Sequence, residues 1–233
     1  MDLAIMQPYF FPYIGYFQLL NTVDEFILYD NIEFTKKGWI NRNRILVNGD
    51  EAFITLPLKK DSDFLHVKDR SLADSWEQDR RKLANRIVES YRKSPYFEQA
   101  FPVIEECILF ENRNLFSFIF NSIEMIRSYL GISSKLIISS SLPIDHTLKG
   151  EDKVLSICEY KKADSYINPI GGVELYSADT FREQGIDLKF LRSNTIEYPQ
   201  FNNKFVPWLS IVDVMMFNDK KSIASYLSNF SLQ

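Results

Sequence analysis

Residues 1–30 read MDLAIMQPYFFPYIGYFQLLNTVDEFILYD and contain two short apolar runs with a helix-like segment between them. The first apolar run, residues 3–6, is too short for a helix and is followed by a Gln-Pro pair, as in a buried parallel strand. Residues 14–20 can form one or two helical turns, and residues 25–30 form the second strand-like run. A strand, a helix and another parallel strand make a right-handed crossover unit.

Crossover units place their ligands at the carboxyl ends of the parallel strands. Residues 7–12 follow the first predicted strand, and residues 30–37 follow the second. Both segments are therefore expected at one edge of a sheet, where a ligand would meet them together.

The same alternation returns in the second half of the chain. Three strand-like runs there are separated by helix-like runs, which favours a parallel sheet with helices on both faces. The predicted strands are 135–143, 164–170 and 186–192, and the predicted helices are 149–163 and 174–185. We therefore predict an α/β, Rossmann-like (HUP-like) fold, with two further helices at 209–218 and 221–230.

The segment between the two sheet-forming parts has a different pattern. Asn48-Gly49 supplies the backbone conformation of a tight hairpin turn between two strand-like runs. Residues 66–72 alternate and predict a further strand, and residues 75–131 form a helical insertion of three helices. No repeat or linker interrupts the chain, so residues 1–233 are expected to form a single domain.

Composition limits the possible classes of function. The chain has 233 residues, 45% of them apolar and 25% charged, which is typical of a soluble globular protein. A net charge of −4 offers no nucleic-acid-binding surface. No apolar run is long enough to cross a bilayer and no basic leader precedes the first strand, so a cytoplasmic location is expected. Cys107 and Cys158 are expected to be buried thiols.

The stretch QPYFFPYIGY, residues 7–16, is a candidate binding-site wall. Gln7 offers both a donor and an acceptor, Gly15 permits a close approach to the backbone, and Tyr9 and Tyr16 offer aromatic faces. The alternative interpretation is an ordinary strand-to-helix turn packed by aromatic rings.

The stretch YDNIEFTKKGWINRNR, residues 29–44, mixes cations, amides and an aromatic ring. Arginine grips phosphate or carboxylate with a planar fork, and lysine offers a point charge. A solvated charged loop is the alternative. The candidate binding residues of this stretch are Asn31, Lys36, Trp39, Asn41, Arg42 and Arg44, and its candidate catalytic residues are Asp30 and Lys37.

Two later motifs complete the candidate site. His146 follows a predicted strand beside Asp145 and could work as an acid–base group, although a lone loop histidine is more often a surface residue. Asn168 ends another predicted strand, and Gly171 and Gly172 could bring backbone amides close to an anion. The two histidines have no metal-ligand spacing, so no metal is expected.

Several long motifs occur in the order typical of one family. The stretches MQPYFFPYIGYFQLL, NIEFTKKGWINRNRI, YINPIGG, ELY, GIDLKFL and LSIVDVMMFN closely resemble the WbqC-like family and together cover nearly the whole chain. This resemblance implies a role in bacterial O-antigen or surface-polysaccharide biosynthesis, which includes lipopolysaccharide. The first motif is also similar to the nucleotide-binding fold of class I synthetases and nucleotidylyltransferases. Those enzymes carry His-x-Gly-His where this chain has Tyr-Ile-Gly-Tyr at 13–16, which puts adenylation chemistry in doubt.

The resemblance and the candidate residues lead to a hypothesis with two alternatives. The leading hypothesis is an enzyme that transfers an acyl or aminoacyl group onto the amine of a nucleotide-linked sugar, with His146 or Asp30 as the proton acceptor. The alternatives are an ATP-dependent ligase or nucleotidylyltransferase, and a non-catalytic protein that binds a sugar nucleotide. The cofactor is unknown beyond a possible acyl donor or ATP, and a homodimer is possible.

Overall fold

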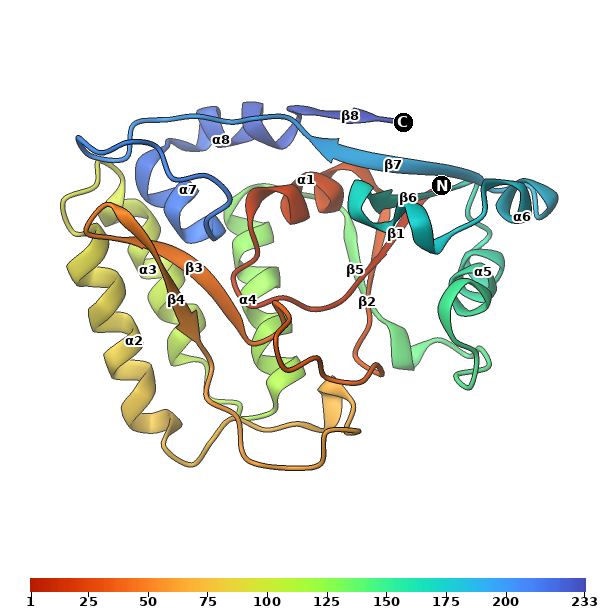
Figure 1. The fold of residues 1–233 in the computed structure, drawn as a ribbon, viewed down its shortest axis with the longest axis horizontal. Helices are drawn as coiled ribbons and strands as arrows, with labels where there is room; N and C mark the ends of the chain where they lie inside the picture. Colours follow the sequence, from red (N-terminus) through yellow and green to blue (C-terminus); the bar gives the residue numbers. More distant parts are fainter.

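A computed structural model describes residues 1–233 and contains a six-stranded sheet. The strand order is β5–β2–β1–β6–β7–β8, in which the first five strands are parallel and β8 is antiparallel to β7. The strands are β1 (Asp2–Met6), β2 (Glu25–Leu28), β5 (Lys135–Ile138), β6 (Ser165–Pro169), β7 (Asp187–Ser193) and β8 (Phe230–Leu232). The Rossmann-like prediction is confirmed, with helices between the parallel strands (Figure 1).

Alternating side chains of β1 divide the interior into two cores. Ala4 belongs to the larger core, whereas Leu3 and Ile5 belong to the smaller one on the opposite face of the sheet. The smaller core packs under α5 (Gly150–Lys161) and α6 (Ala178–Glu183). Both faces of the sheet are therefore buried, as the continuous apolar runs of its central strands require.

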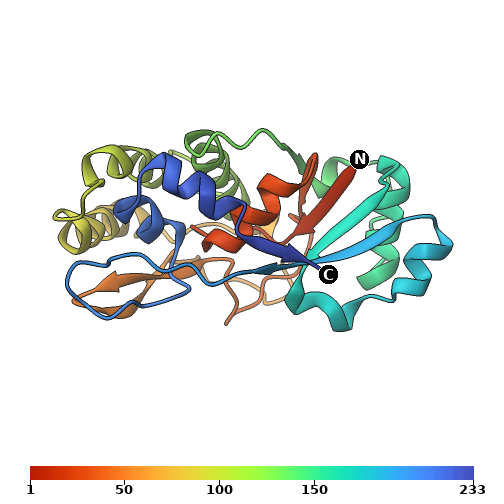
Figure 2. The same ribbon diagram turned by 90° about the horizontal axis from the view of Figure 1, so that it is seen from above.

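The larger core packs under helices from both ends of the chain. These helices are α1 (Ile14–Thr22), α2 (Trp76–Tyr91), α3 (Phe97–Leu109), α4 (Leu115–Tyr129), α7 (Ile211–Phe217) and α8 (Lys220–Leu227). The fully buried Gln18 of α1 ties the two ends together, because its amide donates to the carbonyl oxygens of Tyr226 and Asn229. Figure 2 shows the helical insertion at one end of the molecule and α5 and α6 at the other.

The predicted hairpin forms a separate two-stranded sheet, β3 (Arg42–Val47) and β4 (Asp50–Thr55). Asn48 and Gly49 both have positive φ, 53° and 89°, as a two-residue turn of this kind requires. The hairpin lies beside α2 (Figure 1), where Arg86 donates to the carbonyl oxygen of Phe53.

Three local predictions are wrong. Residues 66–72 do not form a strand: Val67–Asp69 is a short 3-10 helix, η1, whose backbone bonds to the loop after β2. The predicted helix 174–185 is split into η3 (Ile170–Leu175) and α6, because Ser177 caps the second helix from within the predicted one. The predicted helix 221–230 is too long: α8 ends at Leu227, and Phe230 begins β8, which pairs along β7.

No helix of this chain combines the length and the apolar character that a membrane crossing needs.

Candidate functional site

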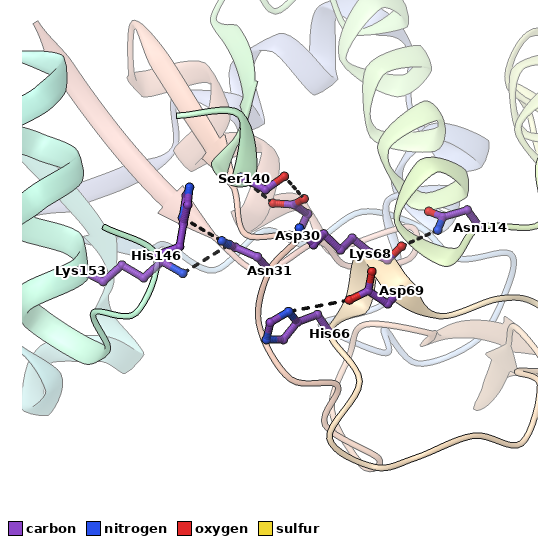
Figure 3. A network of polar contacts seen from close by, with 9 residues as sticks. All are labelled: Asp30, Asn31, His66, Lys68, Asp69, Asn114, Ser140, His146 and Lys153. Carbon is purple, nitrogen blue, oxygen red and sulfur yellow. Dashed lines mark hydrogen bonds and ion pairs between the residues drawn. The ribbon is translucent and has the colours of Figure 1, made fainter. Parts of the chain in front are cut away.

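A network of polar side chains lies at the carboxyl ends of β2 and β5 (Figure 3). The parallel register places Leu28 opposite Ile138, so the residues that follow the two strands are neighbours. Asp30, which is 2% exposed, accepts hydrogen bonds from the backbone N–H (2.8 Å) and the hydroxyl of Ser140. Ser140 belongs to η2 (Ser139–Ser141), a short turn that directs its donors at this carboxylate.

Asn31 connects the two strand ends to the loop that carries His146. Its Oδ1 accepts from the Ser139 hydroxyl at 3.0 Å and from the Lys153 ammonium at 3.3 Å. Its Nδ2 therefore donates to Nδ1 of His146, at 3.0 Å. The other ring nitrogen, Nε2, donates to the carbonyl oxygen of Leu142 at 2.9 Å. In this arrangement Nδ1 accepts and Nε2 donates, so both ring nitrogens are already bonded within the protein.

Lys153 reaches the network from the first turn of α5. Burial lowers the pKa of its ammonium, while the Asp30 carboxylate raises that pKa and the Lys68 charge lowers it. The ammonium also lies 5.1 Å from the centroid of the Tyr29 ring. A buried lysine in this setting can hold an anion, and it loses its proton more readily than a surface lysine does.

Segment η1 lies on the side of Asp30 that is opposite to Lys153 (Figure 3). The backbone N–H of Lys68 donates to the Asp30 carbonyl oxygen at 3.0 Å, and its side chain extends toward Asp30 in Figure 3. His66 and Asp69 lie beside it at the surface, 3.8 Å apart. We use the name edge network for these residues: Asp30, Asn31, Lys68, Ser139, Ser140, His146 and Lys153. Within it, Asp30 and Lys153 are buried beneath the more exposed Asn31, Lys68, Ser140 and His146.

The ring-rich turn and the cationic stretch meet at a cavity of about 190 Å³. We use the name aromatic cavity for the space that six residues line: Tyr9, Tyr13, Trp39, Asn43, Arg44 and Trp208. The Arg44 guanidinium lies 5.3 Å from the Trp39 ring, and it is also paired with Glu51. The cavity thus combines ring faces with one cation, a combination suited to a ring that carries negative charge.

The other cations of this stretch point elsewhere. Lys36 pairs with Asp63 at the surface, 2.7 Å away. Lys37 is exposed, and Arg42 bonds to the carbonyl oxygens of Lys37 and Gly38. Arg42 therefore closes its own loop, and the structure does not bring these three cations to the aromatic cavity.

Two predicted binding residues have structural contacts. Asn41 donates to the carbonyl oxygen of Leu56 at 2.9 Å, which holds the base of the hairpin. Tyr16 is fully buried, and its hydroxyl donates to the carbonyl oxygen of Gln7 at 3.0 Å. Tyr16 thus fixes the turn after β1, and the half-buried Gln7 and Tyr9 remain at the sheet edge.

The glycines of the candidate site accommodate protein side chains. A Cβ at Gly15 would come within 2.3 Å of the Tyr13 ring and 2.5 Å of the Ser193 hydroxyl, so neighbouring side chains fill the space that was predicted for a ligand. At Gly172 a Cβ would come within 1.9 Å of Nδ2 of Asn168, whereas Gly171 faces open space. The Asn168 side chain is buried next to Gly172, where its Oδ1 accepts from the Tyr166 hydroxyl.

The sequence interpretation missed Lys68, Ser139, Ser140 and Lys153. A usable signal existed for the serines, since the SSS run directly follows the predicted strand KLII, and strand ends are where ligands are expected. Lys153 had no comparable signal, because a lysine in the first turn of a predicted helix is usually solvated. No group of three or more His, Cys, Asp or Glu side chains lies together as a metal site would require.

Comparison with known proteins adds a family and one relative. The chain is 28% identical over 227 residues to the uncharacterized protein Rv1507c of Mycobacterium tuberculosis, and the alignment covers 96% of each chain. No solved structure matches. The model of the WbqC-like protein family matches residues 7–225, which include the edge network and the aromatic cavity. The chain therefore belongs to the WbqC-like protein family.

Proposed function

We propose that the chain binds a nucleotide-linked amino sugar at the carboxyl edge of its sheet and transfers an acyl or aminoacyl group onto the sugar amine. The observation that carries this proposal is the edge network, in which a buried carboxylate and a buried ammonium lie beneath hydroxyl and amide groups. Such a concentration of polar groups at the strand ends of a parallel sheet is typical of a ligand site. The resemblance to proteins of surface-polysaccharide biosynthesis supports the sugar nucleotide as the substrate.

In this proposal the two lysines hold the negative charge of the substrate. Lys68 and Lys153 lie on opposite sides of Asp30, and each raises the local positive potential for a phosphate or for a developing oxyanion. The partly exposed amide of Asn31 would orient the acyl carbonyl. Its position is fixed by contacts to Ser139 and His146, so it needs little rearrangement on binding.

Proton transfer is assigned to Asp30 acting through Ser140. The amine nitrogen attacks the acyl carbon of an activated donor such as a thioester, the new C–N bond forms and the C–S bond breaks. The Ser140 hydroxyl accepts the amine proton while its own proton passes to the Asp30 carboxylate, and the released thiolate later takes that proton. His146 is assigned to positioning, because a proton acceptor needs a free nitrogen and both of its nitrogens are bonded.

Mass spectrometry of the reaction product tests the proposal. Purified protein is incubated with UDP- or dTDP-linked amino sugars and a panel of acyl and aminoacyl thioesters, and the expected result is a mass gain that corresponds to one amide bond. Asp30→Asn should lower the rate by a factor of at least about 100, since general base catalysis contributes that much. The matched control, Asp179→Asn, changes an aspartate that is 82% exposed on α6 and should leave the rate unchanged. No mass gain with any donor, while the sugar nucleotide still binds, removes the transferase function.

A second candidate function is ATP-dependent ligation or nucleotidyl transfer. The Rossmann-like sheet and the lysine pair at its carboxyl edge favour it, because the same groups can hold a triphosphate. Release of pyrophosphate from ATP in the presence of the amino sugar would support this candidate over acyl transfer. Binding of the sugar nucleotide with no product of either kind would instead support a non-catalytic binding protein.

A further inference from the structure

A second cavity, of about 200 Å³, lies on the other side of the Tyr13–Trp208 ring pair from the aromatic cavity. Its walls come from the start of α1, the loop after β7 and the start of α7. The apolar part of its lining includes Ile14, Ile196, Phe205, Leu209 and Val214, and no charged side chain lines it. We use the name apolar cavity for this space.

The wall between the two cavities is held in an unusual backbone conformation. Trp208 in the wall has a φ of 60°, and Phe11, which lies two residues before Tyr13 and outside both linings, has a φ of 41°; bulky residues rarely adopt such values. The Ser210 hydroxyl donates to the carbonyl oxygen of Phe11 at 2.7 Å, and Arg44 donates to that of Trp208 at 3.2 Å. Backbone strain that surrounding contacts maintain is typical of ligand sites. Here the strained residue is Trp208, which is 53% exposed and lines both cavities.

The size of the apolar cavity limits its occupant. The cavity is a partly open pocket with a mostly apolar lining and a few polar groups, which is the usual make-up of a small-molecule site. A dry apolar cavity of roughly 150 Å³ binds benzene in another protein. This space can therefore take an apolar group slightly larger than benzene.

We infer that the apolar cavity binds the short aliphatic chain of an acyl donor, and that the anionic part of the same donor lies at Arg44 across the Tyr13–Trp208 wall. The absence of charge in the lining excludes a phosphate or carboxylate from the cavity itself. Arg44 supplies the nearby cation, since it lines the aromatic cavity together with both wall residues, and an anion bound there would compete with its Glu51 partner. The identity of the ligand as an acyl donor rests on the proposed function, whereas the binding of an aliphatic chain does not.

Calorimetric binding of N-acetylcysteamine thioesters to the full chain tests the inference. The hexanoyl thioester should bind at least tenfold more tightly than the acetyl thioester, because only its longer chain fills the cavity. Thr195→Trp, which places an indole at the cavity lining, should weaken hexanoyl binding at least tenfold. Glu197→Trp is the matched control: it adds the same ring to an exposed position two residues away, outside the lining, and should bind as the wild type does.

Fluorescence gives a second measurement, the first part of which needs only the wild-type protein. Hexanoyl thioester should change the tryptophan emission of the wild type, and Trp208→Phe should abolish that change although Trp39 and Trp76 remain. Equal affinity for acetyl and hexanoyl thioesters, no binding by either, or equal binding by the Thr195 and Glu197 variants would overturn the inference. Chain-length-dependent binding without any amide product would support the cavity assignment and refute acyl transfer, so the two failures are distinguishable.

Discussion

Asp213 provides a stability test of the packing behind the two cavities. Its fully buried carboxylate accepts hydrogen bonds from the hydroxyls of Tyr91 (2.9 Å) and Tyr198 (2.7 Å) and from the amide of Gln200 (2.6 Å). Tyr91 in turn accepts from the backbone N–H of Leu46 at 2.8 Å. The carboxylate thus connects α7, α2, the hairpin and the loop after β7. Burial raises the pKa of Asp213 to about 6, although the three hydrogen bonds lower it.

The raised pKa predicts the sign and the size of a pH effect. A group whose pKa is raised on folding contributes stability that is fully present below the unfolded pKa, here 3.8, and is lost as the pH rises through about 6. The shift of about two pKa units corresponds to about 3 kcal/mol of unfolding free energy, at about 1.4 kcal/mol per unit. About 2 kcal/mol of that loss falls between pH 4.5 and pH 7.5.

Asp213→Asn removes this titration. The asparagine keeps the shape of the side chain but has one acceptor oxygen in place of two, so we expect it to cost about 1–3 kcal/mol at low pH. Urea unfolding at pH 4.5, 5.5, 6.5 and 7.5 measures the free energy of unfolding of both proteins. The advantage of the wild type over Asp213→Asn should shrink by about 2 kcal/mol across that range. An advantage that stays constant within about 0.5 kcal/mol, or that grows with pH, would refute the reasoning.

Further predictions concern the edge network and the turn after β6. Lys153→Met should weaken binding of a UDP-linked amino sugar at least tenfold in calorimetry, because it removes a buried cation from the network; the exposed Lys204→Met should not. Gly172→Ala should lower the free energy of unfolding in urea by about 1–3 kcal/mol, because its new Cβ would come within 1.9 Å of Nδ2 of Asn168. A Cβ at Gly171 would face open space, so Gly171→Ala is the control. If it lowered the free energy of unfolding as much as Gly172→Ala does, the packing argument would be contradicted.

The regular parts of the fold follow from local patterns in the sequence. Strands β1 and β2 follow from the short apolar runs at residues 3–6 and 26–28. The hairpin turn follows from Asn48 and Gly49, which adopt the positive φ that such a turn needs. The helices of the insertion follow from apolar residues at helical spacing, as in α2, where Trp76, Leu83 and Ile87 are buried. These signals lie within a few residues of one another, so one sequence suffices to find them.

The site depends on contacts that span most of the chain, and these were predicted only in part. Asp30, Asn31 and His146 were selected because they follow strands, and the structure brings them together. Among the cations of residues 36–44, Lys36 and Arg42 have partners within or beside their own loop, and Arg44 lines the aromatic cavity. The wall residue Trp208 lies 164 positions from Arg44, and no local pattern indicates that pairing.

The position of a bound sugar nucleotide tests the proposed site most directly. We predict that a crystal of the full chain soaked with a UDP-linked amino sugar will show ligand oxygens within hydrogen-bond distance of the ammonium groups of Lys68 or Lys153, with the sugar amine next to the Ser140 hydroxyl. Density for the ligand away from this edge, for example in the polar pocket beside Glu89 and Lys93, would contradict the assignment.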